Sequence, residues 1–380
     1  MPFFQTGDVK AASLHLVASS QWLSDFGVAQ SRVWKPGVTC ITIAANIAES
    51  AVLGVEGCFP DSVVAFSPAL QAEDAYFVKY LLDYHRSRLS SVAQGTTQEN
   101  LSVEKLVAHR FAVPDPVSRR SIVEVLGSID RLIENTTRRI ELLEGIVQAT
   151  YREWFVHFRY PGHERVPLVA SVRGPIPAGW TAKVLGDLAT EVREAVEPSA
   201  STRALPYVPI DSINPRSLTL RTFRPGSEAA SSLRRFETGD VLFGAMRAYF
   251  HKVAIAPFNG LTRSTCFVLR PHSDCGHNYV AVTLSQEATV AYAAAHSSGS
   301  TIPYARWLEA LSEMPALLPT ADVVAMFEDL AEPCIQECQR LAALHRILQQ
   351  LRDLLLPRLL GGLTEVSAVG PERGPMEQTT

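Results

Sequence analysis

Two stretches of the chain carry seam residues at steps that alternate between four and three positions. This spacing places one seam along a helix and is typical of coiled coils. The first seam consists of Ile122, Leu126, Ile129, Ile133, Thr136, Ile140, Leu143, Val147, Thr150 and Trp154. The second seam consists of Val323, Phe327, Leu330, Cys334, Glu337, Leu341, Leu344, Leu348, Leu351 and Leu355. We predict two long helices that bury their seams against each other, with Ser118 as the N-cap of the first helix.

The second seam repeats the first at a fixed distance along the chain. Each of its positions lies 201 residues after its counterpart, which indicates an internal duplication. Shorter matches precede each helix in the same order: residues 35–38 match 238–241, and residues 94–97 match 298–301. The chain is therefore predicted to contain two similar globular units, each followed by a long helix.

Short β-rich runs (40–45 and 62–66), turn signals and helical stretches such as 77–88 alternate in the first globular unit, and the second repeats this α+β pattern. About 29 residues precede Pro206 in the second unit without a counterpart before Pro2. This asymmetry predicts an incomplete first domain with an exposed strand edge. The predicted segments are a first domain (1–113), a spacer helix (114–160), a linker (161–176), a second domain (177–315), a second spacer helix (316–363) and a disordered tail (364–380).

Antiparallel pairing of the two helices predicts globular units at opposite ends of a rod, related by a pseudo-two-fold axis. The ten seam positions extend over about 50 Å of helix at about 1.5 Å per residue. Duplex DNA presents equivalent groove faces about 34–36 Å apart. Two diverged heads held apart in this way would read a split, non-palindromic target.

Bulk composition is that of a globular protein, with 47% hydrophobic residues, 19% charged residues and a net charge of −4. A nucleic-acid surface must therefore be local. The six cysteines show no regular spacing, and the chain has neither a signal-peptide pattern nor a spanning run, so we expect reduced thiols in a cytoplasmic protein without a membrane segment. His272, Cys275 and His277 could suggest zinc, but no second ligand pair follows, and loop residues are the better interpretation.

The second unit carries a local excess of positive charge. Residues 203–270 contain ten Arg or Lys and four Asp or Glu, and the loop 246–252 mixes cations with aromatic side chains, as a groove-facing loop would. A solvated charged surface is the alternative interpretation. In the first unit, residues 1–112 contain eight basic and ten acidic residues, so charge alone does not indicate a DNA surface there.

Nucleotide-binding and hydrolase motifs are absent: the chain has no Walker P-loop, no G-x-G-x-x-G, no H-E-x-x-H and no G-x-S-x-G. Two functions other than DNA reading remain open. Asp8, Lys10 and Asp61 could form a magnesium-dependent nuclease site, although their chain order is unusual. The helices could also serve a coiled-coil adaptor for other proteins.

The order and duplication of several loose motifs resemble the specificity subunits of type I restriction–modification systems. In the first half the resemblance lies in residues 2–10, 40–47, 58–64, 95–98 and 152–155, which read PFFQTGDVK, CITIAANI, CFPDSVV, GTTQ and REWF. In the second half it lies in residues 176–180, 185–188 and 299–301, which read IPAGW, LGDL and GST. With the two helices, the resemblance extends to about residue 363.

This resemblance implies a non-catalytic subunit whose two target-recognition domains each bind one half of a bipartite site in double-stranded DNA. Two methyltransferase subunits would dock along the helices and methylate one flipped adenine in each half-site. Restriction subunits would add translocation and cleavage. The chain itself would need no cofactor, because S-adenosylmethionine, ATP and Mg²⁺ would belong to these partners.

The polar loops, the cation–aromatic loop and the helix flanks supply the site residues expected from this resemblance. The predicted DNA contacts are Lys10, Arg32, Thr97, Gln98, Asn100, Arg247, Tyr249, His251, Lys252, Arg263, Ser300 and Thr301. The predicted partner contacts are Arg131, Arg138, Arg139 and Arg340. No metal ligands and no catalytic residues are predicted.

Overall fold

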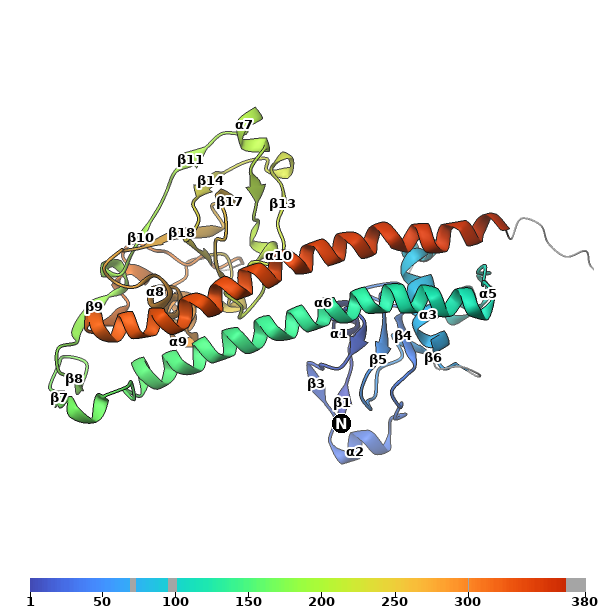
Figure 1. The fold of residues 1–380 in the computed structure, drawn as a ribbon, viewed down its shortest axis with the longest axis horizontal. Coiled ribbons are helices and arrows are strands. Elements are labelled where there is room, and N and C mark those ends of the chain that lie inside the picture. The colour runs from blue at the N-terminus through green and yellow to red at the C-terminus, as the bar shows by residue number, and fades with distance from the viewer. Residues whose placement is uncertain (69–72, 95–100, 300, 367–380) are drawn as a thin grey trace, which may run out of the picture. The chain divides into compact units, whose positions relative to one another are not determined.

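The computed structural model describes residues 1–68, 73–94, 101–299 and 301–366. The chain divides into two compact units, one made of Met1–Asn135 with Ile347–Thr380 and the other of Thr136–Arg346. Two long helices, α6 (Pro116–Tyr151) and α10 (Ala321–Val366), contribute to both units (Figure 1). Among the helices that the structure describes, none is both long enough and apolar enough to cross a bilayer.

The first unit is built on a four-stranded sheet of order β2-β5-β4-β6, with a small β1-β3 ribbon beside it. Helix α3 packs on β4 and β5 (Figure 1). Its strands are β1 (Pro2–Phe3), β2 (His15–Leu16), β3 (Gln21–Trp22), β4 (Thr39–Thr42), β5 (Ser50–Leu53) and β6 (Val63–Phe66). Its shorter helices are α1 (Thr6–Ala11), α2 (Asp25–Ala29), α3 (Glu73–Tyr84), α4 (Arg86–Gln94) and α5 (Val103–Ala108).

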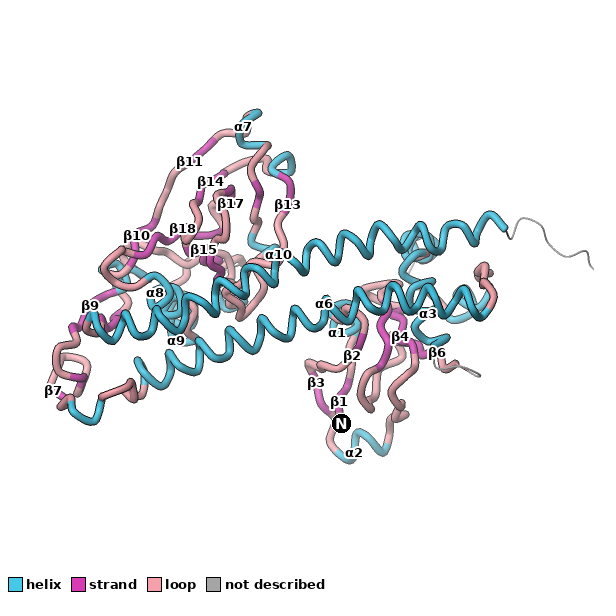
Figure 2. Tube along the Cα trace, in the orientation of Figure 1, coloured by secondary structure: helices cyan, strands magenta, loops and turns pink. Residues whose placement is uncertain are grey.

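The second unit contains a four-stranded sheet of order β10-β18-β15-β16 and a five-stranded sheet of order β11-β14-β17-β12-β13. Figure 2 shows β15 and β18 side by side in the first of these sheets. The remaining strands form the two-stranded pairs β7-β8 and β9-β19. The strands are β7 (Leu168–Val169), β8 (Ile176–Pro177), β9 (Thr181–Val184), β10 (Ala189–Glu191), β11 (Ala195–Val196), β12 (Pro206–Tyr207), β13 (Arg224–Pro225), β14 (Leu233–Phe236), β15 (Val241–Gly244), β16 (Val253–Ile255), β17 (Gly260–Arg263), β18 (Cys266–Pro271) and β19 (Pro315–Leu318). The short helices are α7 (Ala200–Arg203), α8 (His277–Leu284) and α9 (Glu287–Ala295), with 3₁₀ turns at His163–Arg165 in the linker, Leu185–Asp187, Ile210–Ser212, Gly226–Glu228, Ala248–Phe250 and Leu311–Glu313.

Both units share one antiparallel motif, in which β4 pairs with β5 and β6, and β15 pairs with β16 and β18. The turn that leads into the central strand is also repeated. Gly37 and Gly239 both have a φ of 92°, a conformation that glycine adopts without steric cost. The Gly37 N–H donates to Leu53 O and the Gly239 N–H to Ala256 O, each at 2.9 Å. The duplication predicted from sequence is therefore present in the backbone.

The first long helix begins earlier than its predicted cap. Asp115 Oδ1 accepts hydrogen bonds from the N–H groups of Val117 and Ser118 at 2.9 and 3.1 Å, so Asp115 is the N-cap and Ser118 lies inside the first turn. Pro116 occupies the first helical position, where its missing N–H costs nothing. The prediction of Ser118 was wrong because an aspartate before a proline is an equally strong start signal.

The other predicted helix bounds also shift. The first α-helix ends at Tyr151 and continues as a π-helical turn over Arg152–Val156, rather than running to residue 160. The second helix begins at Ala321, not at residue 316, because Pro315–Leu318 forms β19 and pairs antiparallel with Thr181–Val184. A strand directly before the helix extended the apolar pattern and hid the boundary.

The two helices pair antiparallel within each unit. In the first unit Ile129 and Ile133 pack with Leu348, and in the second Ile140 packs with Cys338 and Leu341. Seven of the ten predicted seam positions of α6 are buried, which confirms that seam. They are Ile122, Leu126, Ile129, Ile133, Thr136, Ile140 and Val147.

The seam predicted for α10 was partly wrong. Four of its ten positions are buried, namely Val323, Phe327, Leu341 and Leu348, but Leu344 and Leu351 are 43% and 42% exposed. Other buried positions recur every seven residues at Ala331, Cys338 and His345, and the next position of this repeat is Arg352, whose side chain is 22% exposed. His345 and Arg352 are polar, so apolar spacing alone does not mark this repeat.

Polar groups of α10 are matched by polar groups of α6. In the second unit His345 Nδ1 lies 3.4 Å from the hydroxyls of Thr136 and Thr137. In the first unit Arg352 Nη1 donates to Asp130 Oδ1 at 3.2 Å, and the Tyr80 hydroxyl donates to Asp130 Oδ2 at 2.8 Å. Because Asp130 is fully buried, this layer fixes the helix register and attaches the globular part of the unit to the helix pair.

Candidate nucleic-acid interface

The loop between β15 and β16 contains a tight turn with two residues in the left-handed region. Arg247 has a φ of 52° and His251 a φ of 54°, and between them Ala248–Phe250 forms a single 3₁₀ turn. Neither residue is glycine, so the conformation is strained and must be held by its surroundings. Backbone strain of this kind occurs most often at functional sites.

Backbone and side-chain contacts hold this turn in place. The Arg247 N–H donates to Pro303 O at 2.8 Å, and the Arg216 N–H donates to His251 O at 2.8 Å. His251 Nε2 donates to Ser285 O at 2.7 Å. The turn is thus fixed on the residues that surround it.

Two of the predicted DNA-binding loops adjoin each other here. Tyr304 forms bridges with Met246 and Ser298, and the Ala305 N–H donates to Ala245 O at 2.9 Å. Thr301, a predicted contact, lies exposed in this second loop. The combined surface exposes aromatic, aliphatic and cationic side chains. They are Tyr249, Phe250, Ile302, Tyr304 and Arg306.

His251 and Lys252 have structural contacts that their sequence position did not suggest. His251 is buried, and Lys252 Nζ donates to Ile210 O at 2.9 Å. Both side chains therefore make hydrogen bonds that stabilise the turn. Tyr249 and Phe250, with ring centroids 4.8 Å apart, are the side chains that the turn leaves in solvent.

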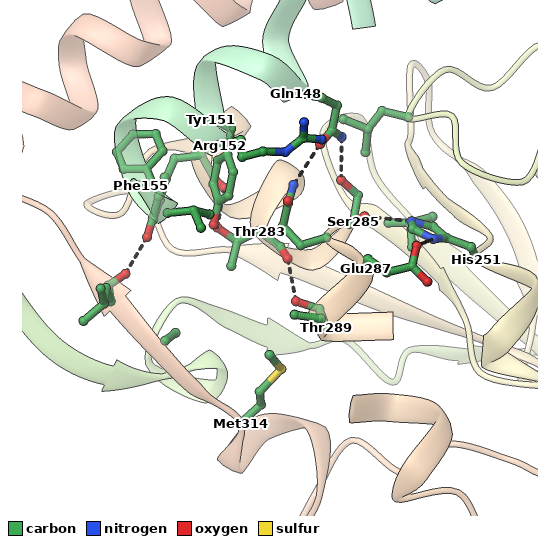
Figure 3. Close-up of a pocket in the computed structure, with 18 of the residues that line it drawn as sticks. Gln148, Tyr151, Arg152, Phe155, His251, Thr283, Ser285, Glu287, Thr289 and Met314 are labelled. Atoms are coloured by element: carbon green, nitrogen blue, oxygen red, sulfur yellow. Dashed lines mark hydrogen bonds and ion pairs between the residues drawn. The ribbon is translucent and has the colours of Figure 1, made fainter. Parts of the chain in front are cut away.

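A cavity of about 600 Å³ lies below the turn within the second unit. Figure 3 shows His251 beside Glu287 at one end, and Gln148 bonded to Ser285 near the centre. The Tyr151 hydroxyl is hydrogen-bonded to Thr283 at 3.0 Å. Many polar side chains that line the cavity are therefore hydrogen-bonded to neighbouring side chains. Residues of α6 and His251 of the turn line the same cavity.

Glu144 attaches α6 to this part of the second unit. Its Oε1 accepts hydrogen bonds from the Thr219 N–H, the Thr219 hydroxyl and the Ser217 hydroxyl at 2.8, 2.6 and 3.0 Å. Burial raises the pKa of the Glu144 carboxyl above its ordinary value of 4.5, and the hydrogen bonds only partly oppose this.

We expect Glu144→Ala to lower the free energy of unfolding of the second unit by about 1–3 kcal/mol, because buried donors lose their acceptor. Glu144→Gln keeps an oxygen for them and should retain most of the stability. Since the folded pKa is raised, the wild-type contribution is largest below 4.5 and falls as pH rises through the folded value. Denaturant unfolding between pH 4 and 8 measures this slope. An unchanged slope in Glu144→Gln would assign it to another group.

The positive charge of residues 203–270 is smaller in the folded chain than the sequence suggested. Arg234, Arg235 and Arg216 form ion pairs with acids outside that window, namely Glu191, Glu194 and Glu287. Arg270 pairs with Asp240 at 2.7 Å. Arg263 lies exposed on β17. Other exposed arginines of this window lie on separate elements, with Arg203 at the end of α7 and Arg224 on β13.

In the first unit the predicted DNA contacts are only partly described. Lys10 is exposed at the end of α1 and donates to Asn46 Oδ1 at 3.3 Å. Arg32 lies with its guanidinium carbon 3.8 Å from the centre of the Trp34 ring. Three predicted contacts of this unit, and one of the second, lie outside the described residues. They are Thr97, Gln98, Asn100 and Ser300.

One of the predicted partner arginines, Arg139, is engaged across the helix pair, and Arg340 contacts the same acid on its own helix. Arg139 Nη2 lies 2.9 Å from Glu337 Oε1, and Arg340 lies 3.6 Å from the same carboxylate. Arg138 pairs with Glu141 on its own helix at 3.6 Å, and Arg131 is exposed.

The helices also expose apolar stripes that were not predicted from the sequence, and one of their residues, Leu351, was assigned to the seam. In the first unit Ile347, Leu351 and Leu354 are 60%, 42% and 61% exposed at helical spacing. In the second unit Leu142 and Ile146 are each 51% exposed, one turn apart. Within each group these apolar side chains lie on one face of the helix, because three- and four-residue steps bring them to the same side.

The structure gives little support to the metal or nuclease interpretations. Within the described part of the chain, one group of possible ligands gathers within 4.8 Å, made of His272, Asp274 and Cys275. His272 already bonds Thr190 and Asp187 O through its two ring nitrogens, and His277 bonds Gly239 O instead. Asp8 is not in such a group, because its oxygens accept from the backbone of Gln5 and Ser20.

Comparison with known proteins identifies relatives of one kind. The chain is 23% identical over 292 residues to the MjaIX specificity subunit of a type I restriction enzyme from Methanocaldococcus jannaschii. The match covers 72% of this chain and 65% of that relative, so the chain spans less than two thirds of the relative's length. No family model matches the chain.

A solved structure of similar fold carries the same description. The S subunit of a type I restriction–modification system from M. genitalium superposes with a TM-score of 0.53 at 13% identity, over 94% of this chain and 88% of that one. The HsdS subunit from Thermoanaerobacter tengcongensis gives 0.33 at 17% identity over 95% and 90%, a score too low to equate the folds. In sequence and in fold, this chain is therefore similar to the specificity subunits of type I restriction–modification systems, as its duplicated motifs predicted.

Proposed function

We propose that this chain is the non-catalytic DNA-specificity subunit of a type I restriction–modification complex. Each unit reads one half of a bipartite, asymmetric site in double-stranded DNA. The observation that carries the proposal is the repetition of one sheet motif in two units, each packed on a segment of the same antiparallel helix pair. A second copy with a diverged sequence is suited to a second, different half-site.

The partners in this proposal are two methyltransferase subunits, one for each unit, and restriction subunits. The apolar stripes at Ile347, Leu351 and Leu354 and at Leu142 and Ile146 are the surfaces that the methyltransferases cover. The arginines that flank the seam lie at the rim of this proposed interface, where exposed ion pairs contribute little to the binding free energy. S-adenosylmethionine, ATP and Mg²⁺ are bound by the partner subunits.

Mapping methylated adenines in the DNA of a cell that carries this chain and its partners tests the proposal. We expect a split motif with one modified adenine in each half and a spacer of fixed length and free sequence. DNA retention by the assembled complex should also fall steeply with salt. A continuous motif, or no modified motif, would contradict the proposal.

A further inference from the structure

The strained turn of the second unit has a counterpart in the first. Between β4 and β5, Ala45 has a φ of 58° and Ala48 a φ of 63°, just as Arg247 and His251 flank the turn between β15 and β16. Two left-handed non-glycine residues therefore recur at corresponding places in both copies. Their steric cost opposes folding in each copy, so the repeated geometry indicates a shared task.

The surroundings of the two turns are repeated as well. The Leu101 N–H donates to Ile43 O at 2.8 Å, as the Ala305 N–H donates to Ala245 O at 2.9 Å. In the first turn the Ala48 N–H donates to Thr42 O at 2.9 Å, and the Thr42 hydroxyl donates to Asn46 O. Both turns are thus rigid supports for the residues at their tips.

The tips carry different chemistry. The second turn exposes Tyr249 and Phe250, which are 54% and 48% accessible. The first turn carries Asn46 and Ile47, both half-buried, and Lys10 holds the Asn46 side-chain oxygen. This contact leaves the Asn46 amino group to donate to another acceptor.

We propose that this turn is the base-contacting element of both units, with Tyr249 and Phe250 stacking on bases of one half-site and Asn46 donating to a base edge of the other. The inference rests on the proposed function and assigns its specificity. Stacking on a rigid aromatic pair suits nucleobases, whose faces are apolar, and Arg247 and Arg306 supply nearby positive charge. A side-chain amide can recognise the edge of a purine.

The test uses the full chain assembled with its partners. We expect Tyr249→Ala with Phe250→Ala to weaken binding to the cognate duplex about 10- to 100-fold, and to relax or abolish methylation specificity in one half of the motif. Asn46→Ala should relax one position in the other half only. Tyr249→Phe with Phe250→Tyr keeps both rings and should retain the wild-type motif.

The outcomes separate the two proposals. All these side chains are partly or fully exposed at the tips, so an unchanged melting temperature verifies folding. A wild-type complex that yields a split motif, with variants that keep its sequence and affinity, would overturn the inference and leave the proposed function standing. Variants that alter the same half-site would also overturn it. A wild-type complex without a split motif would overturn the proposed function itself.

Discussion

Asp130→Ala is expected to destabilise the first unit by about 3–5 kcal/mol, the range for breaking a buried ion pair from one side. Asp130 is fully buried and accepts from both Arg352 and Tyr80, so its loss leaves two donors without their acceptor between the helices. Amide hydrogen exchange, resolved for peptides of each unit, should show faster exchange in α3 and in the segments of α6 and α10 that belong to the first unit.

Asp353→Ala provides a matched control. Asp353 binds the same guanidinium, with Arg352 Nη2 at 3.0 Å from its Oδ1, but its side chain is 65% exposed. A solvated pair contributes about 0–1 kcal/mol, so this variant should exchange at nearly the wild-type rate. Equal effects of the two substitutions would show that burial of Asp130 does not determine the stability of the layer.

The same layer explains which part of the helix pair could be predicted from sequence. The α6 seam was identified because its buried positions are almost all aliphatic, so spacing and chemistry agree. In α10 the seven-residue repeat includes buried His345 and partly buried Arg352, which contact Thr136 and Asp130 of the other helix. Such matching is a tertiary property, and apolar periodicity cannot reveal it.

The candidate site, too, could be predicted from the sequence only in part. The duplication and the cation–aromatic composition single out residues 246–252 from the sequence alone. Asn46 was not found, because the sequence Ala45-Asn46-Ile47-Ala48 lacks the glycine that usually marks a left-handed turn. His251 was assigned to DNA although its ring nitrogen bonds Ser285 O, a carbonyl far away in the chain.

The positive charge counted along the sequence is partly neutralised in the folded chain. Counting residues within a sequence window ignored the acids that folding brings from elsewhere, such as Glu191 beside Arg234. On the helices, Arg139 and Arg340 share Glu337 rather than standing free. We therefore base the proposed protein interface on exposed apolar side chains, because their desolvation supplies a driving force that surface charges lack.

In the proposed complex with two methyltransferase copies, Leu351→Asp is expected to reduce the number of copies bound from two to one. Leu351 lies at the centre of the exposed stripe of the first unit, and a carboxylate there would be desolvated on docking. A loss of about 2–4 kcal/mol at a central contact weakens binding by roughly 30- to 1,000-fold. Native mass spectrometry of the assembled complex measures the stoichiometry directly.

Two further variants make this expectation specific. Ile146→Asp on the stripe of the second unit should remove the other copy, and the double variant should bind neither. Leu351→Met preserves an apolar side chain of similar volume and should keep both copies. Because Leu351 and Ile146 are exposed in the chain alone, circular dichroism and melting temperature should be unchanged in all variants. If Leu351→Asp still binds two methyltransferases, the stripe is not the docking surface, and the exposed arginine flanks at Arg131 and Arg138 become the better assignment.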